Sequence, residues 1–234
     1  MITAYITNTG KYAEGKASGD WLRFPTTTEE VQALLSRIGV DGVSYEEYFI
    51  AEYQVEISGL RVLGQYENID ELNYLASLLA EMNDFPLDKY EAAILRSDSS
   101  GNAKDLINLV HNLDSYDYFP GVCNHEELGR YLIDELSMET IPEWIGDYFD
   151  YEAYGRDFEF NTGGIFTPTG FVYRDYKQDF IEHYNGRDDI PGEYRVFEYP
   201  IPPEREVSMS STISTSLMKD RDVLELIYKE KLKD

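Results

Sequence analysis

The sequence has 234 residues, 42% hydrophobic and 14% aromatic, which is enough apolar material for one large core or two to three small ones. It carries 45 Asp and Glu against 20 Lys and Arg, and the net charge of −25 argues against binding nucleic acid through phosphates, which requires clustered cations. One cysteine excludes an intramolecular disulfide, and no stretch reaches the roughly 18 apolar residues of a membrane span. We expect a cytoplasmic protein that binds neither nucleic acid nor membrane, and a partner with a basic surface fits its charge.

The first sixty residues mix strand and helix signals. Alternation predicts short strands over 4–7 and 20–24, joined through a glycine-containing turn, and residues 47–55 are rich in aromatic and β-branched side chains typical of a third strand. Between them, Thr27 and Glu30 form a capping box that opens a helix ending at Gly39. Residues 1–60 are therefore expected to form an N-terminal α+β domain.

The next sixty residues read as helices. Asn68 caps an apolar three- and four-residue periodicity up to Met82, a second helix follows Pro86, and a third spans 102–113. We expect a central helical domain over 61–120, with little room for a deep pocket. Acids on the outer faces of these helices are expected to be solvated, namely Asp70, Glu71, Glu81, Asp84, Asp88, Glu91 and Asp105.

A second mixed segment follows over 121–178. Residues 116–122 form an aromatic loop in this interpretation, a helix covers 124–136, and a hairpin has strands at 163–166 and 171–173. Beyond it, 193–199 resembles an edge strand, 200–203 and 208–216 loops, and 220–232 a closing helix, in an extension of unknown role over 179–234. The predicted fold class is α+β, an elongated chain of three small domains with an additional C-terminal tail.

The stretch 140–160, TIPEWIGDYFDYEAYGRDFEF, combines many acids with many aromatics, which a solvated tail would not need. Thr140 and Glu143 make a capping box with Pro142 in the first turn, so we expect a helix to begin here. Acids recur at steps of four, four, four and three, and any helical part of this run carries carboxylates on one side, about 6 Å apart along the axis. The run comprises Glu135, Glu139, Glu143, Asp147 and Asp150, and Pro142 is expected to divide it between two helices. An ordinary solvated helix face remains the alternative.

The negative charge is concentrated in the middle of the chain. Residues 41–159 hold 27 acids and six bases, a net charge of −21, whereas residues 1–40 sum to zero. Duplex DNA carries one charge per roughly 1.7 Å of axis, so −21 corresponds to roughly 36 Å, about one turn.

The sequence lacks a recognisable catalytic or metal motif. It has no glycine-rich nucleotide loop, no paired zinc spacing, no twelve-residue calcium loop and no nucleophile elbow. A glycosidase-like pair drawn from Asp150, Glu152, Asp157 and Glu159 is one alternative, although adjacent acids arise by chance among 45. We therefore expect no enzyme activity, no cofactor and no metal.

The chain resembles the ArdA antirestriction proteins, which are carried by plasmids, conjugative transposons and phages. The resemblance covers about residues 1–178 and is closest at 141–159, above all in the FDYEAYGRD core at 149–157. Residues 19–22, 64–67 and the 164–171 hairpin support it. The tail beyond about Gln178 departs from the shorter family members.

The resemblance implies a non-enzymatic inhibitor, a dimeric mimic of bent duplex DNA that occupies the DNA-binding groove of type I restriction–modification enzymes. It leaves open whether modification is inhibited along with restriction. In this hypothesis the phosphate-like charge comes from Glu135, Glu139, Glu143, Asp147, Asp150, Glu152, Asp157 and Glu159. Packing against the core or a second protomer is assigned to Trp144, Tyr148, Phe149, Tyr151 and Tyr154, and Arg156 offsets its acidic neighbours or links the dimer. The rival from another class is an acidic adaptor or chaperone-like module for a different basic protein.

Overall fold

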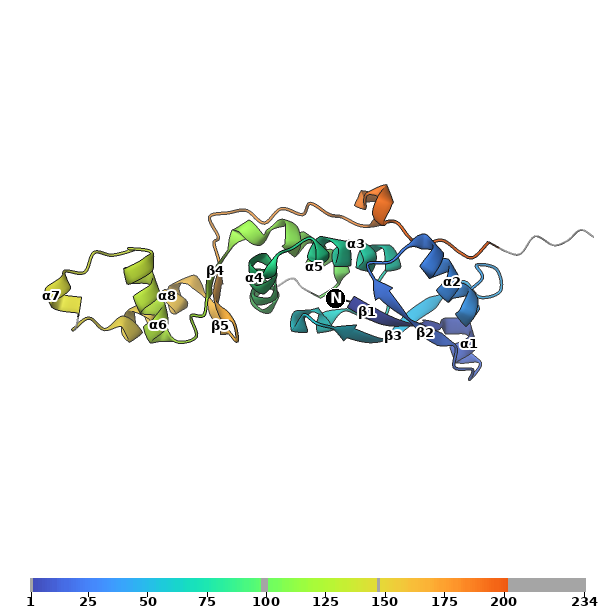
Figure 1. Cartoon of the computed structure of the whole chain (residues 1–234), viewed down its shortest axis with the longest axis horizontal. Coiled ribbons are helices and arrows are strands. Elements are labelled where there is room, and N and C mark those ends of the chain that lie inside the picture. Colours follow the sequence, from blue (N-terminus) through green and yellow to red (C-terminus); the bar gives the residue numbers. More distant parts are fainter. Residues whose placement is uncertain (1, 98–100, 147, 202–234) are drawn as a thin grey trace, which may run out of the picture. The chain divides into compact units, whose positions relative to one another are not determined.

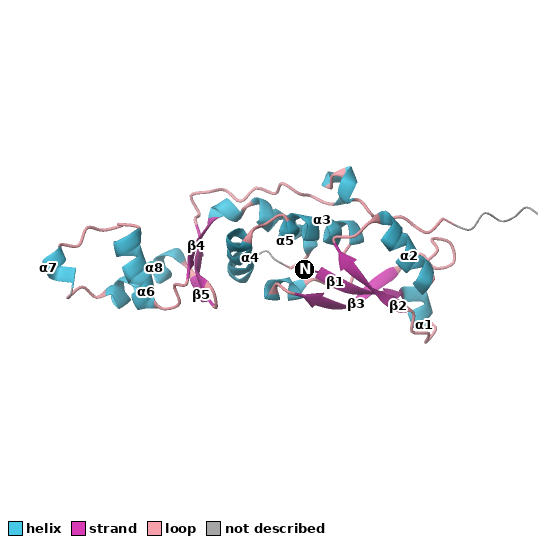
Figure 2. Cartoon of the chain, viewed as in Figure 1, coloured by secondary structure: helices cyan, strands magenta, loops and turns pink. Residues whose placement is uncertain are grey.

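A computed structural model describes residues 2–97, 101–146 and 148–201. It contains helices and two three-stranded antiparallel sheets, in agreement with the predicted α+β class (Figures 1 and 2). The described residues up to Pro200 form one compact unit. The predicted division into three domains stays a prediction.

The N-terminal sheet has the order β2-β1-β3, with β1 (Ile2–Asn8) between β2 (Gly19–Phe24) and β3 (Tyr48–Val55). All three predicted strands are confirmed. Alternate side chains of β1 are buried, and α2 (Thr28–Ile38) packs against β2. The Thr27 side chain accepts from the Glu30 amide, and Gly39 ends α2 at φ 77°, so both predicted signals act as expected. A short α1 (Thr9–Ala13), capped by Asn8, was not predicted.

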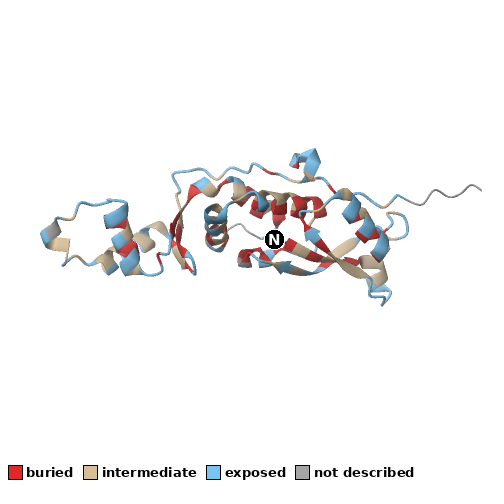
Figure 3. Cartoon of the chain, viewed as in Figure 1, coloured by how far each residue is buried: buried red, intermediate tan, exposed pale blue. Residues whose placement is uncertain are grey.

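The next three helices share a core with this sheet. They are α3 (Ile69–Ala80), α4 (Asp84–Arg96) and α5 (Ala103–His111), and buried residues run without interruption from β1 through α3 to α5 (Figure 3). Helix α4 begins before Pro86 rather than after it, because proline is tolerated in a first turn. The fully buried Tyr90 of α4 donates a hydrogen bond to the Leu106 carbonyl, which ties α4 to α5.

The second sheet has the order β4-β6-β5, with β4 (Tyr116–Pro120), β6 (Gly170–Arg174) and β5 (Ile165–Thr167). The predicted β5–β6 hairpin is confirmed, but the predicted aromatic loop at 116–122 is wrong. Residues Tyr116–Pro120 form a strand, since they pair with β6 from Tyr116 opposite Arg174 to Pro120 opposite Gly170. Helix α4 contacts all three strands of this sheet.

The acid- and aromatic-rich region contains three helical segments. The first, α6 (His125–Arg130), continues into a π-helical turn over Tyr131–Glu135, the second is α7 (Glu143–Gly146), and the third is α8 (Tyr151–Thr162). A helix begins shortly after Thr140, but α7 is a single turn, and α8 starts afresh with Asp150 as its cap. A small second core lies under α6, formed by Phe119, Val122, Leu128, Leu132 and Phe171.

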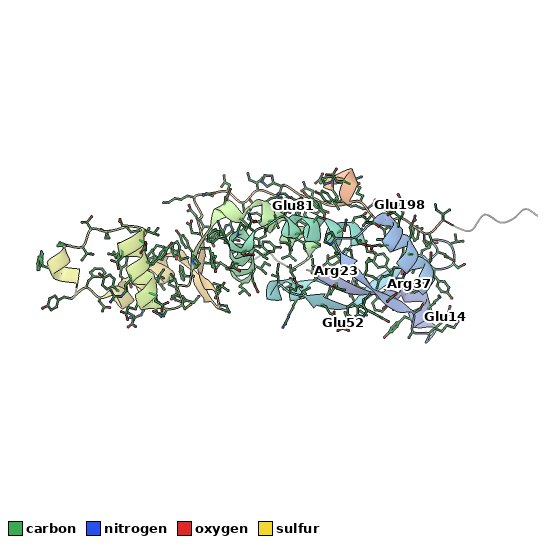
Figure 4. All side chains as sticks on the ribbon, in the orientation of Figure 1. Glu14, Arg23, Arg37, Glu52, Glu81 and Glu198 are labelled. Atoms are coloured by element: carbon green, nitrogen blue, oxygen red, sulfur yellow. The ribbon has the colours of Figure 1, made fainter. Side chains whose placement is uncertain are left out.

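We call residues 176–200 the strap, because this segment runs over α3 and α5. It has only two single 3-10 turns, Arg187–Asp189 and Gly192–Tyr194, so the predicted edge strand at 193–199 is wrong. The strap continues to α2, where Gln32 donates to the Tyr199 carbonyl, and Glu198 is labelled there in Figure 4. The loop expected at 208–216 and the helix expected at 220–232 lie outside the described residues.

Asp70 also contradicts the sequence interpretation. It was expected to be solvated on the outer face of α3, yet it is 0% exposed. The strap covers it, and Arg187, Val196 and Phe197 of the strap all donate hydrogen bonds to its carboxylate.

Candidate functional site

The candidate site comprises residues 124–162, from the start of α6 to the end of α8. Eleven acids and two arginines lie between 121 and 162. Side-chain caps start both α6 and α8, since Asn124 accepts from the Glu127 amide and Asp150 accepts from the Ala153 amide. An acid in the first turn of each helix interacts favourably with the positive end of the helix dipole.

Two glycines set the distance between α6 and α8. A Cβ atom on Gly129 would lie 1.9 Å from the Tyr151 carbonyl oxygen, and one on Gly155 would lie 2.0 Å from the His125 carbonyl oxygen. Both helices therefore approach with backbone against backbone, which a side chain at either position would prevent. Gly155 belongs to the FDYEAYGRD core, so this contact gives a structural reason for a glycine in mid-helix.

Both arginines of the site are engaged by glutamates one helical turn away. Arg130 Nη2 lies 3.0 Å from Glu126 Oε1, and Arg156 Nη2 lies 2.6 Å from Glu152 Oε1. The Arg130 guanidinium also stacks 4.4 Å from the centroid of the Tyr151 ring. Arg156 thus lies in an ion pair with an acidic neighbour of its own helix.

Five of the eight candidate carboxylates lie on exposed residues: Glu135, Glu139, Asp150, Glu152 and Asp157. Asp150 also serves as the α8 cap, so its oxygen has a structural role. Glu159 is half-buried, and its Oε2 lies 2.7 Å from His125 Nε2. The side chain of Glu143 and the whole of Asp147 lie outside the described residues.

The described acids of the run from Glu135 to Asp150 lie on separate segments. Glu135 ends the π-helical turn, Glu139 lies in the irregular segment that follows, and Asp150 precedes α8. A left-handed Ser137 (φ 51°) and the bond from the Met138 amide to the Leu132 carbonyl fix the chain as it leaves the π-helical turn. The acids are thus presented from separate segments.

The motif aromatics fall into two groups. The Phe149 ring packs 4.9 Å from Tyr151 and 5.7 Å from Tyr154, and Tyr154 contacts the second core, so these three have the expected packing contacts. Trp144 and Tyr148 are 77% and 88% exposed. These two side chains therefore do not pack in the core of this chain.

A depression of about 430 Å³ lies between the end of α6 and the segment that carries Glu139. It is lined by Arg130, Ile133, Asp134, Ser137, Glu139, Thr140, Ile141, Gly146 and Tyr151. The described part of the chain contains no group of three or more His, Cys, Asp or Glu side chains arranged to hold a metal ion.

Sequence reasoning missed three features of this site: the Gly129–Gly155 crossing, the His125–Glu159 contact and the stacking of Arg130 on Tyr151. The two glycines inside helical patterns were the available signal for the crossing, because an isolated helical glycine usually has a packing reason. The other two depend on the contact between α6 and α8, which local patterns do not specify.

A family model described as antirestriction protein (ArdA) matches residues 4–173. The chain belongs to the ArdA antirestriction protein family. Membership implies an antirestriction function, in which the protein binds restriction enzymes as an inhibitor. The family is not known for an enzyme activity of its own. The match contains α6, α7 and α8 and ends before the strap. A search of curated proteins found no match. None of the helices in the described residues is long and apolar enough to cross a membrane.

Proposed function

We propose that this chain inhibits type I restriction–modification enzymes by presenting carboxylates where those enzymes bind DNA phosphates. The observation that supports this proposal is the set of exposed acids in the candidate site, where both arginines already form ion pairs with glutamates of the same chain. Eleven acids and two arginines give residues 121–162 a net charge of −9, which equals the charge on roughly 15 Å of duplex axis. The Lys and Arg side chains of the restriction–modification enzyme that normally bind DNA phosphates would bind this acidic surface instead.

The charge acts as a distributed field in this proposal. The five exposed carboxylates come from three segments held by the α6–α8 contact, so no single one is positioned to dominate. Exposed ion pairs contribute up to about 1 kcal/mol each and weaken with salt. One charge reversal that abolished inhibition while the fold survived would contradict this distribution.

We further propose that the protein acts as a homodimer in which Trp144 and Tyr148 contact a second copy. Both side chains are largely exposed next to the well-packed Phe149, and large exposed aromatics are typical of interface anchors. Arg156 already has a glutamate partner in its own chain, which favours its local role over a link across the dimer.

A matched pair of charge variants tests the proposed inhibition. Glu139→Lys combined with Asp157→Lys reverses two exposed acids of the site, and Asp179→Lys combined with Glu193→Lys reverses two exposed acids of the strap. Both double variants change the net charge equally. We expect the first to raise the concentration needed for half-inhibition of a type I enzyme about tenfold, as two lost contacts of about 0.7 kcal/mol would.

The control double variant should change that concentration less than twofold. Equal losses in both variants would show that only net charge matters and would contradict a localised site. Both double variants should melt at the same temperature as the unchanged chain, so that a difference in inhibition reflects charge and not unfolding.

A further inference from the structure

The strap is held to the helices almost as a bound peptide is held by a receptor. Apart from a local turn in which the Gln178 amide donates to the Asp175 carbonyl, the hydrogen bonds between the described strap and the rest of the chain involve side chains. The backbone-to-backbone bond from the Asp175 amide to the Ser115 carbonyl, just before the strap, ties the chain to the segment that follows α5. The strap therefore joins the fold through side-chain recognition and not through a sheet.

Two asparagines four residues apart, Asn108 in α5 and Asn112 at its C-terminal cap, bind the strap main chain through both the oxygen and the nitrogen of their side-chain amides. Asn108 donates to the Tyr184 carbonyl at 2.8 Å and accepts from the Tyr184 amide at 2.9 Å. Asn112 makes the same pair with Ile181, both at 2.8 Å. Both asparagines are buried. Because these bonds go to the main chain, they recognise an extended backbone and do not by themselves select its side chains.

Helix α3 continues this recognition further along the strap. Asp70 accepts from the Val196 and Phe197 amides, both at 2.7 Å, and Asn73 donates to the Tyr194 carbonyl at 3.0 Å. Buried polar groups of this kind are costly unless they are paired. The face formed by α3 and α5 therefore needs an extended chain over it.

Side-chain contacts give this face its selectivity. The buried Tyr184 side chain donates to Glu71 Oε1 at 2.7 Å, and Arg187 pairs with Asp70. Ile190 and Val196 are buried in the main core. The matching segment thus carries Tyr, then Arg and then Ile at three-residue intervals, followed six residues later by Val.

We propose that the face of α3 and α5 is a peptide-binding site that also accepts the strap of a second copy of this chain. The receptor groups belong to α3, to α5 and to the cap residue Asn112 that ends α5, and the ligand groups belong to a segment with only two single 3-10 turns. The contacts are the same whichever copy supplies the strap. Exchanging straps between two copies therefore loses no contact, and only changes which chain the strap belongs to. This site is distinct from the acidic surface and does not depend on it.

A synthetic peptide of residues 180–198 represents the strap of the second copy in the test. The full chain is labelled with ¹⁵N, and amide hydrogen exchange is followed with and without excess unlabelled peptide. We expect the Ile181, Tyr184, Val196 and Phe197 amides to exchange severalfold faster, because the peptide occupies the face each time the strap opens. The Leu109 amide inside α5 should keep its rate, since the face is refilled.

A peptide with Tyr184→Ala and Arg187→Ala is the matched control and should leave all rates unchanged. The Arg187→Ala full chain, whose own strap is weakened, should respond at lower peptide concentration. Unchanged strap amides in both the original and the Arg187→Ala chains would overturn the proposal. So would equal acceleration at Leu109, because that would indicate unfolding and not exchange.

A mixing experiment tests the second copy directly. Affinity-tagged unchanged chain is incubated with untagged Arg187→Ala chain, and the untagged chain recovered with the tag is measured. We expect excess strap peptide to reduce this recovery, and the control peptide not to. A dimer formed through Trp144 and Tyr148 would survive the peptide, so recovery that is insensitive to peptide would overturn strap exchange without touching the proposed antirestriction surface.

Discussion

Asp70 and Arg187 lie 117 residues apart in the sequence and form an ion pair. The Asp70 carboxylate in this pair has no exposure to solvent. The same carboxylate also holds the Val196 and Phe197 amides, so it is satisfied only while the strap is in place. This buried acid of α3 is thus the attachment point of a distant segment.

The first prediction concerns this attachment. Asp70→Ala leaves the Val196 and Phe197 amides without their acceptor and Arg187 without its partner, so we expect the free energy of unfolding to fall by about 3 kcal/mol. The measurement is urea denaturation followed by circular dichroism. The exposed Asp88 of α4 is the control, and Asp88→Ala should change stability by less than about 0.5 kcal/mol. Equal effects would contradict the role of Asp70.

The second prediction concerns the contact between α6 and α8. Gly155→Ala places a Cβ atom against the His125 carbonyl oxygen, and neither helix backbone can move away easily. We therefore expect the free energy of unfolding to fall by about 2 to 3 kcal/mol and inhibition to weaken. Nothing lies within 4 Å of a Cβ on Gly192, and Gly192→Ala should stay within about 0.5 kcal/mol of the unchanged chain. Thermal melting and a restriction-protection assay give the two readouts. Full stability in Gly155→Ala would refute the close crossing.

The third prediction concerns pH. Burial, and then the neighbouring His183, lower the pKa of His111 below its ordinary value of 6.5. The unfolded chain therefore binds a proton more readily than the folded one, and the His111 contribution to stability is complete above 6.5 and is lost as pH falls through it. Denaturation midpoints between about pH 7.5 and 5.5 should decline less steeply in His111→Gln. An unchanged slope would show that His111 does not carry the effect.

The fourth prediction concerns the exposed aromatics. Trp144→Ala combined with Tyr148→Ala should shift the protein from dimer to monomer in sedimentation velocity without lowering its melting temperature, because neither side chain packs in the core of its own chain. Val43→Ala combined with Tyr66→Ala removes two side chains of similar exposure elsewhere and should leave the dimer intact. A double variant at Trp144 and Tyr148 that remained dimeric would contradict the proposed contact.

Local signals in the sequence predicted much of the fold. Thr27 and Asn68 were expected to cap helices, and each side chain accepts the amide hydrogen bond that a cap requires. Gly39 ends α2 in the left-handed conformation that favours glycine. These features involve neighbours within a few residues, which is why the sequence alone reveals them.

The failures come from contacts between distant residues. Residues Tyr116–Pro120 resembled a loop because their partner strand begins at Gly170. Asp70 resembled a solvated acid because the strap that covers it lies more than a hundred residues away. In the site, aromatic composition did not distinguish the packed Phe149 from the exposed Trp144 and Tyr148, since the irregular segment between α6 and α8 decides their exposure.

The most direct test of the proposed DNA mimicry is competition. The purified chain is titrated into a type I methyltransferase bound to labelled specific DNA, at a low and a moderate salt concentration. We expect displacement at near-stoichiometric protein, with a higher concentration required at moderate salt because exposed charges are screened. Retention of the DNA at a large excess of the chain, at both salt concentrations, would contradict DNA mimicry and favour an acidic adaptor for another basic protein.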